Sequence, residues 1–214
     1  MQAPSKNTAL FNETKPAAIR IWHWLVFLFF TASITTVIFG STLFKTSNTI
    51  GLVQEQVQQG GGTITPKQAR SVAHEFSDQL WMLHKYIGFG LSFLMLWRIV
   101  AEFAIAKDKK LYPRLKQAIA IPNGTDDKNH YVMVQYLYIL FYVLFLLMAL
   151  TGLVLAFEDV EWLKPVHKAS KQIHSLVQWG LYAYIIIHIT GVIMADLTKY
   201  NGIVSRMING KKSQ

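Results

Sequence analysis

The segment that decides the fold lies near the C-terminal end, where residues 173–195 read IHSLVQWGLYAYIIIHITGVIMA. It contains no Asp, Glu, Lys or Arg, and a helix of about 20 apolar residues spans the hydrocarbon core of a bilayer. It also holds two histidines, His174 and His188, which are 14 residues apart. At about 100° per residue they project from one helix face, roughly 21 Å apart along the axis. Ionisable groups are costly inside a membrane, so both are candidate site residues.

Three further stretches are long and apolar enough to span a bilayer. They run from about residue 21 to 44, from 81 to 106 and from 131 to 157. Hydrophobic residues make up 52% of the 214-residue chain and charged residues only 15%. Soluble domains carry about 25% charged residues, and disorder requires low hydrophobicity, so both classes are disfavoured. We predict an all-α membrane protein, a single domain over residues 1–214 that forms a four-helix transmembrane bundle.

The Lys and Arg side chains predict the orientation, because cytoplasmic loops carry an excess of them. An even number of spans places segments 1–20, 98–128 and 199–212 on one side, and these hold twice as many basic residues as the other side. We therefore expect both termini in the cytoplasm. The net charge of +9 then marks the cytoplasmic face and offers no case for nucleic acid. The first apolar run exceeds the length of a cleavable signal, so it is expected to remain as an anchor.

The connection between the first two spans, residues 45–80, is the longest outer loop. We expect Gly60-Gly61-Gly62 and the Gln-rich run before it to be flexible. Thr65-Pro66-Lys67-Gln68 has the form of a capping box with proline at the first helical position. Apolar residues follow at helical spacing and predict an amphipathic outer helix over about residues 66–80. A bilayer surface and a docking partner are equally good fits for its apolar face.

Cysteine is absent, which excludes disulfides, thiolate-bound iron–sulfur clusters and c-type haem attachment. Four of the seven histidines lie in or at spans. The direction of each span places His23 and His188 at the inner level and His84 and His174 at the outer level. We call these the inner pair and the outer histidines. Two facing imidazoles in an apolar bundle suit the iron of a haem, whereas zinc requires three or four ligands.

Two arginines are candidates for pairing with haem propionates. Arg98 follows His84 by 14 residues, so it shares that helix face and lies at the inner level. Arg20 precedes His23 by three residues. A guanidinium binds a carboxylate through two hydrogen bonds, although either side chain could instead reach lipid phosphates.

A glycine in the second span offers room for a macrocycle. Gly88 lies one turn beyond the histidine of that span, on the same face, and packing between helices is an equally good explanation. The remaining histidines, His74, His130 and His167, are expected in loops. Of these, His167 is the substitute ligand if His174 is not one.

These residues together resemble the prokaryotic cytochrome b561 superfamily. The shared patterns, in order over the four spans, are Arg20-Ile-Trp-His23-Trp24, His84-x3-Gly88-x9-Arg98 and His174-x13-His188. Within that superfamily the chain is most similar to the b-type cytochrome subunit of membrane-bound nickel–iron hydrogenases. The C-terminal pattern Gly202-x2-Ser205-x-Met207-Ile-Asn-Gly210 resembles the motif that ends those subunits. The segment between the third and fourth spans is shorter here, which leaves the docking partner open.

The resemblance implies two haems b with bis-histidine ligation in a bacterial inner membrane. His23 and His188 would ligate the inner haem, and His84 and His174 the outer one, in agreement with their depths. A periplasmic oxidoreductase subunit or cytochrome would exchange electrons at the outer haem, and a quinone at the inner one. The resemblance thus favours an electron-transfer subunit over a stand-alone enzyme.

Two other functions are open to the same sequence. One is a self-contained superoxide:quinone oxidoreductase, which would attract its anion through a basic outer surface. Acidic residues nearly cancel that charge here, so it ranks second. The other is a scaffold without cofactor, which the 14-residue spacing of the histidines disfavours.

Overall fold

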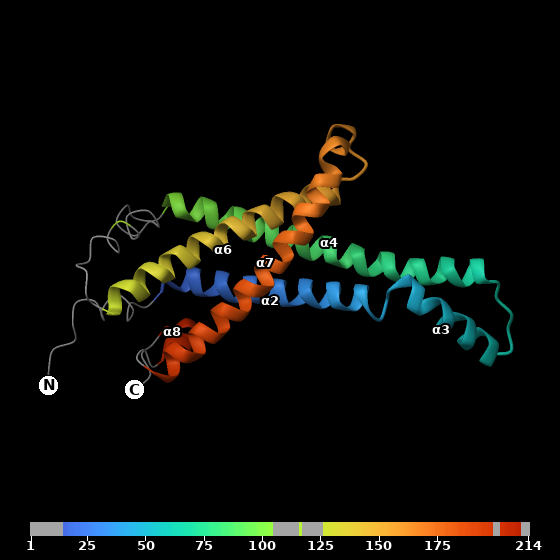
Figure 1. The fold of residues 1–214 in the computed structure, drawn as a ribbon, viewed down its shortest axis with the longest axis horizontal. Helices are drawn as coiled ribbons and strands as arrows, with labels where there is room; N and C mark the ends of the chain where they lie inside the picture. The colour runs from blue at the N-terminus through green and yellow to red at the C-terminus, as the bar shows by residue number, and fades with distance from the viewer. Residues whose placement is uncertain (1–14, 105–115, 117–125, 199–201, 211–214) are drawn as a thin grey trace. The chain divides into compact units, whose positions relative to one another are not determined.

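A computed structural model describes residues 15–104, 116, 126–198 and 202–210 (Figure 1). The regular elements over these ranges are α2 (Ala17–Ser41), α3 (Thr46–Gln59), α4 (Pro66–Ala104), α6 (Asp126–Ala156), the 3₁₀ helix η2 (Glu161–Leu163), α7 (Lys164–Leu197) and α8 (Ile203–Asn209). Four of them, α2, α4, α6 and α7, are long and apolar enough to cross a membrane. The prediction of an all-helical protein with four candidate spans is therefore confirmed. Most of the basic segment 98–128, on which the orientation depends, lies outside the described residues, so the orientation stays a prediction.

The chain divides into two compact units, and each is described by itself. The α3 unit comprises Leu25–Phe93. The α6–α7 unit comprises Met1–Trp24 and Leu94–Gln214. In both units large apolar side chains of the spanning helices are exposed, among them Leu28 at 58% in the α3 unit and Leu176 at 73% in the α6–α7 unit. Apolar surface of this extent on long helices is what a hydrocarbon environment requires.

The Gln-rich run before the three glycines is helical, so the prediction that it is flexible is wrong. It forms α3, in which Ile50, Val53 and Val57 recur at helical spacing and are half-buried. This apolar stripe is narrow, and the segment is rich in glutamine, so its composition alone does not indicate a helix. The glycines end the helix in a Schellman arrangement: Gly61 has φ 77°, and the N–H of Gly62 donates to the Val57 carbonyl at 2.9 Å.

α4 begins at Pro66 with a reciprocal capping box. The Thr65 N–H donates to Oε1 of Gln68 at 3.0 Å, and the Gln68 N–H donates to Oγ1 of Thr65 at 3.3 Å. The helix then continues unbroken to Ala104, so the amphipathic outer segment and the second apolar stretch form one element. Ala69 and Ala73 are fully buried along this first part.

The loop prediction for the three remaining histidines is also wrong. His74 lies in α4, His130 in α6 and His167 in α7. These helices extend beyond their apolar stretches, where a side chain can contact another one turn away on the same helix. His74, for example, lies 2.7 Å from the carboxylate of Asp78, one turn away.

α6 and α7 pack against each other as an antiparallel pair in the α6–α7 unit (Figure 1). Their connection, residues 157–163, is short and includes η2, which reverses the chain directly. Phe145, Val177 and Leu181 are buried, with Phe145 only 1% exposed. A Cβ on Gly180 would lie 3.3 Å from Leu144, so the two helices approach closely.

Candidate functional site

The inner pair lies together in the α6–α7 unit. His23 of α2 and His188 of α7 have ring centroids 6.2 Å apart, with their planes inclined by 55°. Trp24 meets the His23 ring edge-on at 5.5 Å, and Tyr184 stacks on His188 at 6.0 Å with 7° between the planes. Within the described part of the chain, the buried Nδ1 of His23 has no hydrogen-bond partner. The sequence-predicted inner histidines are thus brought together among aromatic rings.

The geometry of the inner pair fits a single iron atom. Two imidazoles that bind one metal from opposite sides, each nitrogen about 2 Å away, have ring centres roughly 6 Å apart. The observed separation of 6.2 Å agrees with this value. Among the residues that the structure describes, no group of three or more His, Cys, Asp or Glu could hold a metal ion.

His84 lies on α4 in the α3 unit, next to a threonine of α2. Its Nδ1 is 2.8 Å from the hydroxyl oxygen of Thr36, and Trp81 meets its ring edge-on at 5.6 Å. No described atom lies within 4 Å of the position that a Cβ on Gly88 would occupy. Gly88 therefore has no described neighbour on its side of the helix, as Gly51 and Gly191 also do not.

His174 lies on α7 and faces α6. Its Nδ1 is 3.0 Å from the hydroxyl oxygen of Thr151, and a Cβ on Gly152 would lie 3.2 Å from its Cε1. Gly152 therefore lets the ring approach α6 closely. His84 and His174 belong to different units, so each is described in its own surroundings and their pairing remains a prediction.

Arg98 is engaged by partners from its own unit. Its Nε donates to the Tyr142 hydroxyl at 3.0 Å, and its Nη1 forms a 2.8 Å ion pair with Glu102. The Arg98 guanidinium also lies over the Tyr142 ring, 5.5 Å from its centroid. These contacts use two of the five guanidinium donors, so a propionate would have to bind through the others. The ion pair with Glu102 could have been predicted from the i, i+4 spacing in the sequence. The contact with Tyr142 could not, because it joins residues 44 positions apart.

Arg20 and Trp24 contact the C-terminal helix α8. Arg20 Nη1 donates to the Ile208 carbonyl at 3.3 Å, and Trp24 Nε1 donates to the Met207 carbonyl at 3.1 Å. A Cβ on Gly210 would collide with the Arg20 guanidinium. Both side chains that flank His23 in sequence therefore hold the end of the chain, a role that the sequence did not indicate.

The C-terminal glycines delimit α8. Gly202 precedes it with φ 81° and Gly210 follows it with φ 74°, both in the left-handed region that favours glycine. The Val204 N–H donates to Oδ1 of Asp196 at the end of α7, at 3.4 Å. The C-terminal pattern therefore encodes a short helix that turns back onto α7 and the start of α2.

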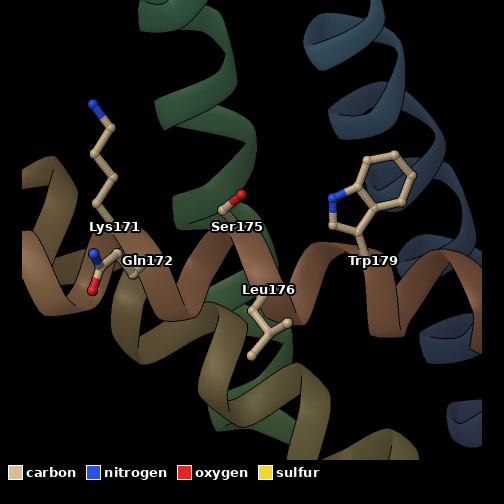
Figure 2. Close-up of a pocket in the computed structure, with 5 residues that line it drawn as sticks. All are labelled: Lys171, Gln172, Ser175, Leu176 and Trp179. Carbon is tan, nitrogen blue, oxygen red and sulfur yellow. The ribbon is translucent and has the colours of Figure 1, made fainter.

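A shallow hollow lies along α7 and does not include a predicted site residue. It is lined by Lys171, Gln172, Ser175, Leu176 and Trp179 (Figure 2). The lining changes from polar to apolar along the helix, as expected where a helix passes from headgroups into hydrocarbon.

Comparison with known proteins agrees with the pattern of residues. A family model described as prokaryotic cytochrome b561 matches residues 15–210, nearly the whole chain, and confirms the resemblance. No curated protein and no solved structure matches the chain. The matched region includes all four candidate spans, the four predicted ligand histidines and α8. The chain therefore belongs to the prokaryotic cytochrome b561 family and is a membrane b-type cytochrome of electron transfer.

Proposed function

We propose that this chain is a dihaem b-type cytochrome that transfers electrons across the bacterial inner membrane between a periplasmic redox partner and the quinone pool. The observation that carries the proposal is the inner pair, whose ring centroids are 6.2 Å apart and which lies on two candidate membrane-spanning helices. The family supplies the expectation of b-type haem. The four candidate spans support a location in the membrane.

The second haem rests on the outer histidines. His174 and His188 are 14 residues apart on α7, which is roughly 21 Å along the axis. A bilayer core is about 30 Å thick, so one ligand at each level gives two cofactor depths. His84 is the partner that the direction of the second span offers to His174.

The residues of the chain bind and orient the cofactors, while haem iron would supply reversible one-electron transfer. The four histidines supply axial nitrogens, and Gly88 leaves space on its helix face. Arg98 and Arg20 are the proposed propionate partners, each with donors in addition to those that contact the chain.

The periplasmic partner is proposed to be a hydrogenase-like or other dehydrogenase subunit, or a cytochrome. With both termini in the cytoplasm, the outer histidines face the periplasm and the inner pair faces the cytoplasmic side, where quinone exchange is proposed. Quinone reduction by superoxide with the purified chain alone would instead support the superoxide:quinone oxidoreductase. Co-purification with a dehydrogenase would support the electron-transfer subunit.

Haem stoichiometry tests the cofactor assignment. Protein purified after haem-sufficient expression should contain about two haems b per chain. His23→Ala or His188→Ala should remove one of them, and His84→Ala or His174→Ala the other, because each iron loses an axial ligand. The matched control His74→Ala, in the outer part of α4, should retain both.

Two results would contradict these assignments. A colourless preparation would exclude a haem protein of any kind. Loss of a haem in His167→Ala but not in His174→Ala would show that the outer ligand has been placed on the wrong turn of α7.

A further inference from the structure

Two threonines make the same contact with the outer histidines in separate units. Thr36 Oγ1 lies 2.8 Å from Nδ1 of His84 in the α3 unit. Thr151 Oγ1 lies 3.0 Å from Nδ1 of His174 in the α6–α7 unit. Both threonines are buried, at 5% and 8% exposure. The repetition of one arrangement on unrelated helix pairs is difficult to attribute to packing alone.

The hydroxyl hydrogen of each threonine is already committed. Thr36 donates to the Ser33 carbonyl at 2.7 Å, and Thr151 donates to the Leu147 carbonyl at 2.6 Å. A carbonyl oxygen can only accept, and a hydroxyl has a single hydrogen. The hydroxyl oxygen therefore faces the histidine as an acceptor, and the ring must donate from Nδ1.

This hydrogen bond determines the tautomer of the ring. A neutral imidazole carries one N–H, so a ring that donates from Nδ1 carries its lone pair on Nε2. That lone pair is the one that an axial ligand needs. Each threonine thus prepares its histidine for iron and restricts the rotation of the ring.

The inner pair differs in this respect. In the described structure the buried Nδ1 of His23 has no acceptor, and its ring is held by Trp24 instead. An acceptor on the remote N–H raises the basicity of a histidine ligand. A more basic ligand stabilises the ferric state and lowers the reduction potential, since hydrogen bonding beyond the ligands is one of the factors that tune a haem.

We propose that Thr36 and Thr151 are positioning residues that hold His84 and His174 with Nε2 toward the iron and lower the reduction potential of the haem that these histidines bind. The proposal rests on the ligand assignment made above. The outer haem accordingly has a lower potential than it would have without the two hydroxyl groups.

The experiment compares valine and serine at both positions in the intact protein. Thr36→Val and Thr151→Val keep the shape of the side chain and remove the hydroxyl acceptor, whereas Thr36→Ser and Thr151→Ser keep it. The Ser33 carbonyl, which also contacts the His84 ring, stays in Thr36→Val, so the larger effect is expected in Thr151→Val. The readouts are a potentiometric titration followed by visible spectroscopy and the electron paramagnetic resonance spectrum of the ferric protein. The matched control is Thr35→Val, because Thr35 also donates to its own helix at 2.8 Å but has an exposed hydroxyl.

Each valine variant should raise the midpoint potential of one haem, the same haem in both cases, and change its ferric spectrum. The serine variants and Thr35→Val should retain the wild-type potentials. A valine variant that keeps two haems with unchanged potentials overturns the proposal for that threonine. Equal shifts, or equal haem loss, in valine and serine variants would assign the effect to packing and overturn it as well.

Failure of the ligand assignment gives a different result. If His84→Ala and His174→Ala retain two haems, the assignment on which the proposal rests is wrong. If these variants lose one haem while the valine variants leave both potentials unchanged, the assignment stands and only the role of the threonines fails.

Discussion

The inner pair and the outer histidines are held by different means. His23 and His188 lie among aromatic rings, and the two residues that flank His23 contact the C-terminal helix. His84 and His174 each form a hydrogen bond with a threonine hydroxyl. Aromatic packing orients a ring without selecting its tautomer, whereas an acceptor of fixed direction does both. The inner pair and the outer histidines are therefore expected to respond to different substitutions.

The largest effect is expected for a substitution at Gly210, which should affect the inner haem and leave the outer haem unchanged. Gly210→Val places a β-branched residue at φ 74°, where its side chain collides with the Arg20 guanidinium. The backbone strain alone costs roughly 1–2 kcal/mol, and the Arg20 guanidinium has to move, which breaks its hydrogen bond to the Ile208 carbonyl. We expect the inner haem to dissociate at lower temperature, measured by loss of its visible band on heating.

The control for that substitution is Gly61→Val, which has the same left-handed backbone at φ 77° but no atom of the described residues near its Cβ position. It should strain the end of α3 and leave the inner haem in place. Equal haem loss in Gly61→Val and Gly210→Val would show that general destabilisation, and not the contact with Arg20, is responsible.

The second effect concerns the outer level. Gly152→Leu inserts a side chain where even a Cβ would lie 3.2 Å from Cε1 of His174, so the ring must move. Overpacking of this kind costs about 1–3 kcal/mol. The outer haem should be under-occupied in the purified protein, with the inner haem retained. Gly51→Leu in α3, whose Cβ position also has no described atom within 4 Å, should keep both haems. A selective loss of the inner haem in Gly152→Leu would contradict the assignment of His174 to the outer haem.

The third effect tests whether Arg98 binds a propionate of the inner haem or contacts only Tyr142 and Glu102. If Arg98 binds a propionate, Arg98→Gln removes a positive charge near the inner haem and should lower its potential. Tyr142→Phe removes only the 3.0 Å hydrogen bond to Nε, worth about 1 kcal/mol, and should leave that potential nearly unchanged. Redox titration of both variants distinguishes the two roles. If the potential of the inner haem is the same in Arg98→Gln and in the wild type, Arg98 does not bind a propionate and serves only its contacts with Tyr142 and Glu102.

The sequence predicted what depends on spacing along one helix. Four apolar stretches, the 14-residue interval between His174 and His188 and the capping box at Thr65 all follow from periodicity and length. The inner pair could also be inferred, because the direction of each span places its histidine at a definite depth. Its ring separation of 6.2 Å could not, since it depends on side-chain rotamers.

Contacts between helices distant in sequence were not predictable from one chain. Thr36 and Thr151 look like ordinary membrane-helix threonines that bond their own backbone, and only the fold brings the histidines to them. Arg20 was assigned to a propionate because of its position beside His23. Its contact with α8 joins residues 188 positions apart, for which the sequence offers no signal. The helix α3 was missed because three half-buried aliphatic residues are a weak periodic pattern among glutamines.

The smallest expected effect separates the two functions of Trp24. Its ring meets His23 edge-on at 5.5 Å, and its Nε1 donates to the Met207 carbonyl of α8 at 3.1 Å. Trp24→Phe keeps an aromatic ring beside His23 and removes the donor, so it should weaken the attachment of α8 by about 1 kcal/mol without loss of haem. Hydrogen exchange of the α8 amides measures that change. Trp24→Leu removes the ring as well and should in addition broaden the electron paramagnetic resonance spectrum of the ferric inner haem, because the His23 ring loses its edge-on contact with Trp24. A spectrum in Trp24→Leu identical to that of Trp24→Phe would mean that the His23 plane is set by the haem itself and not by aromatic packing.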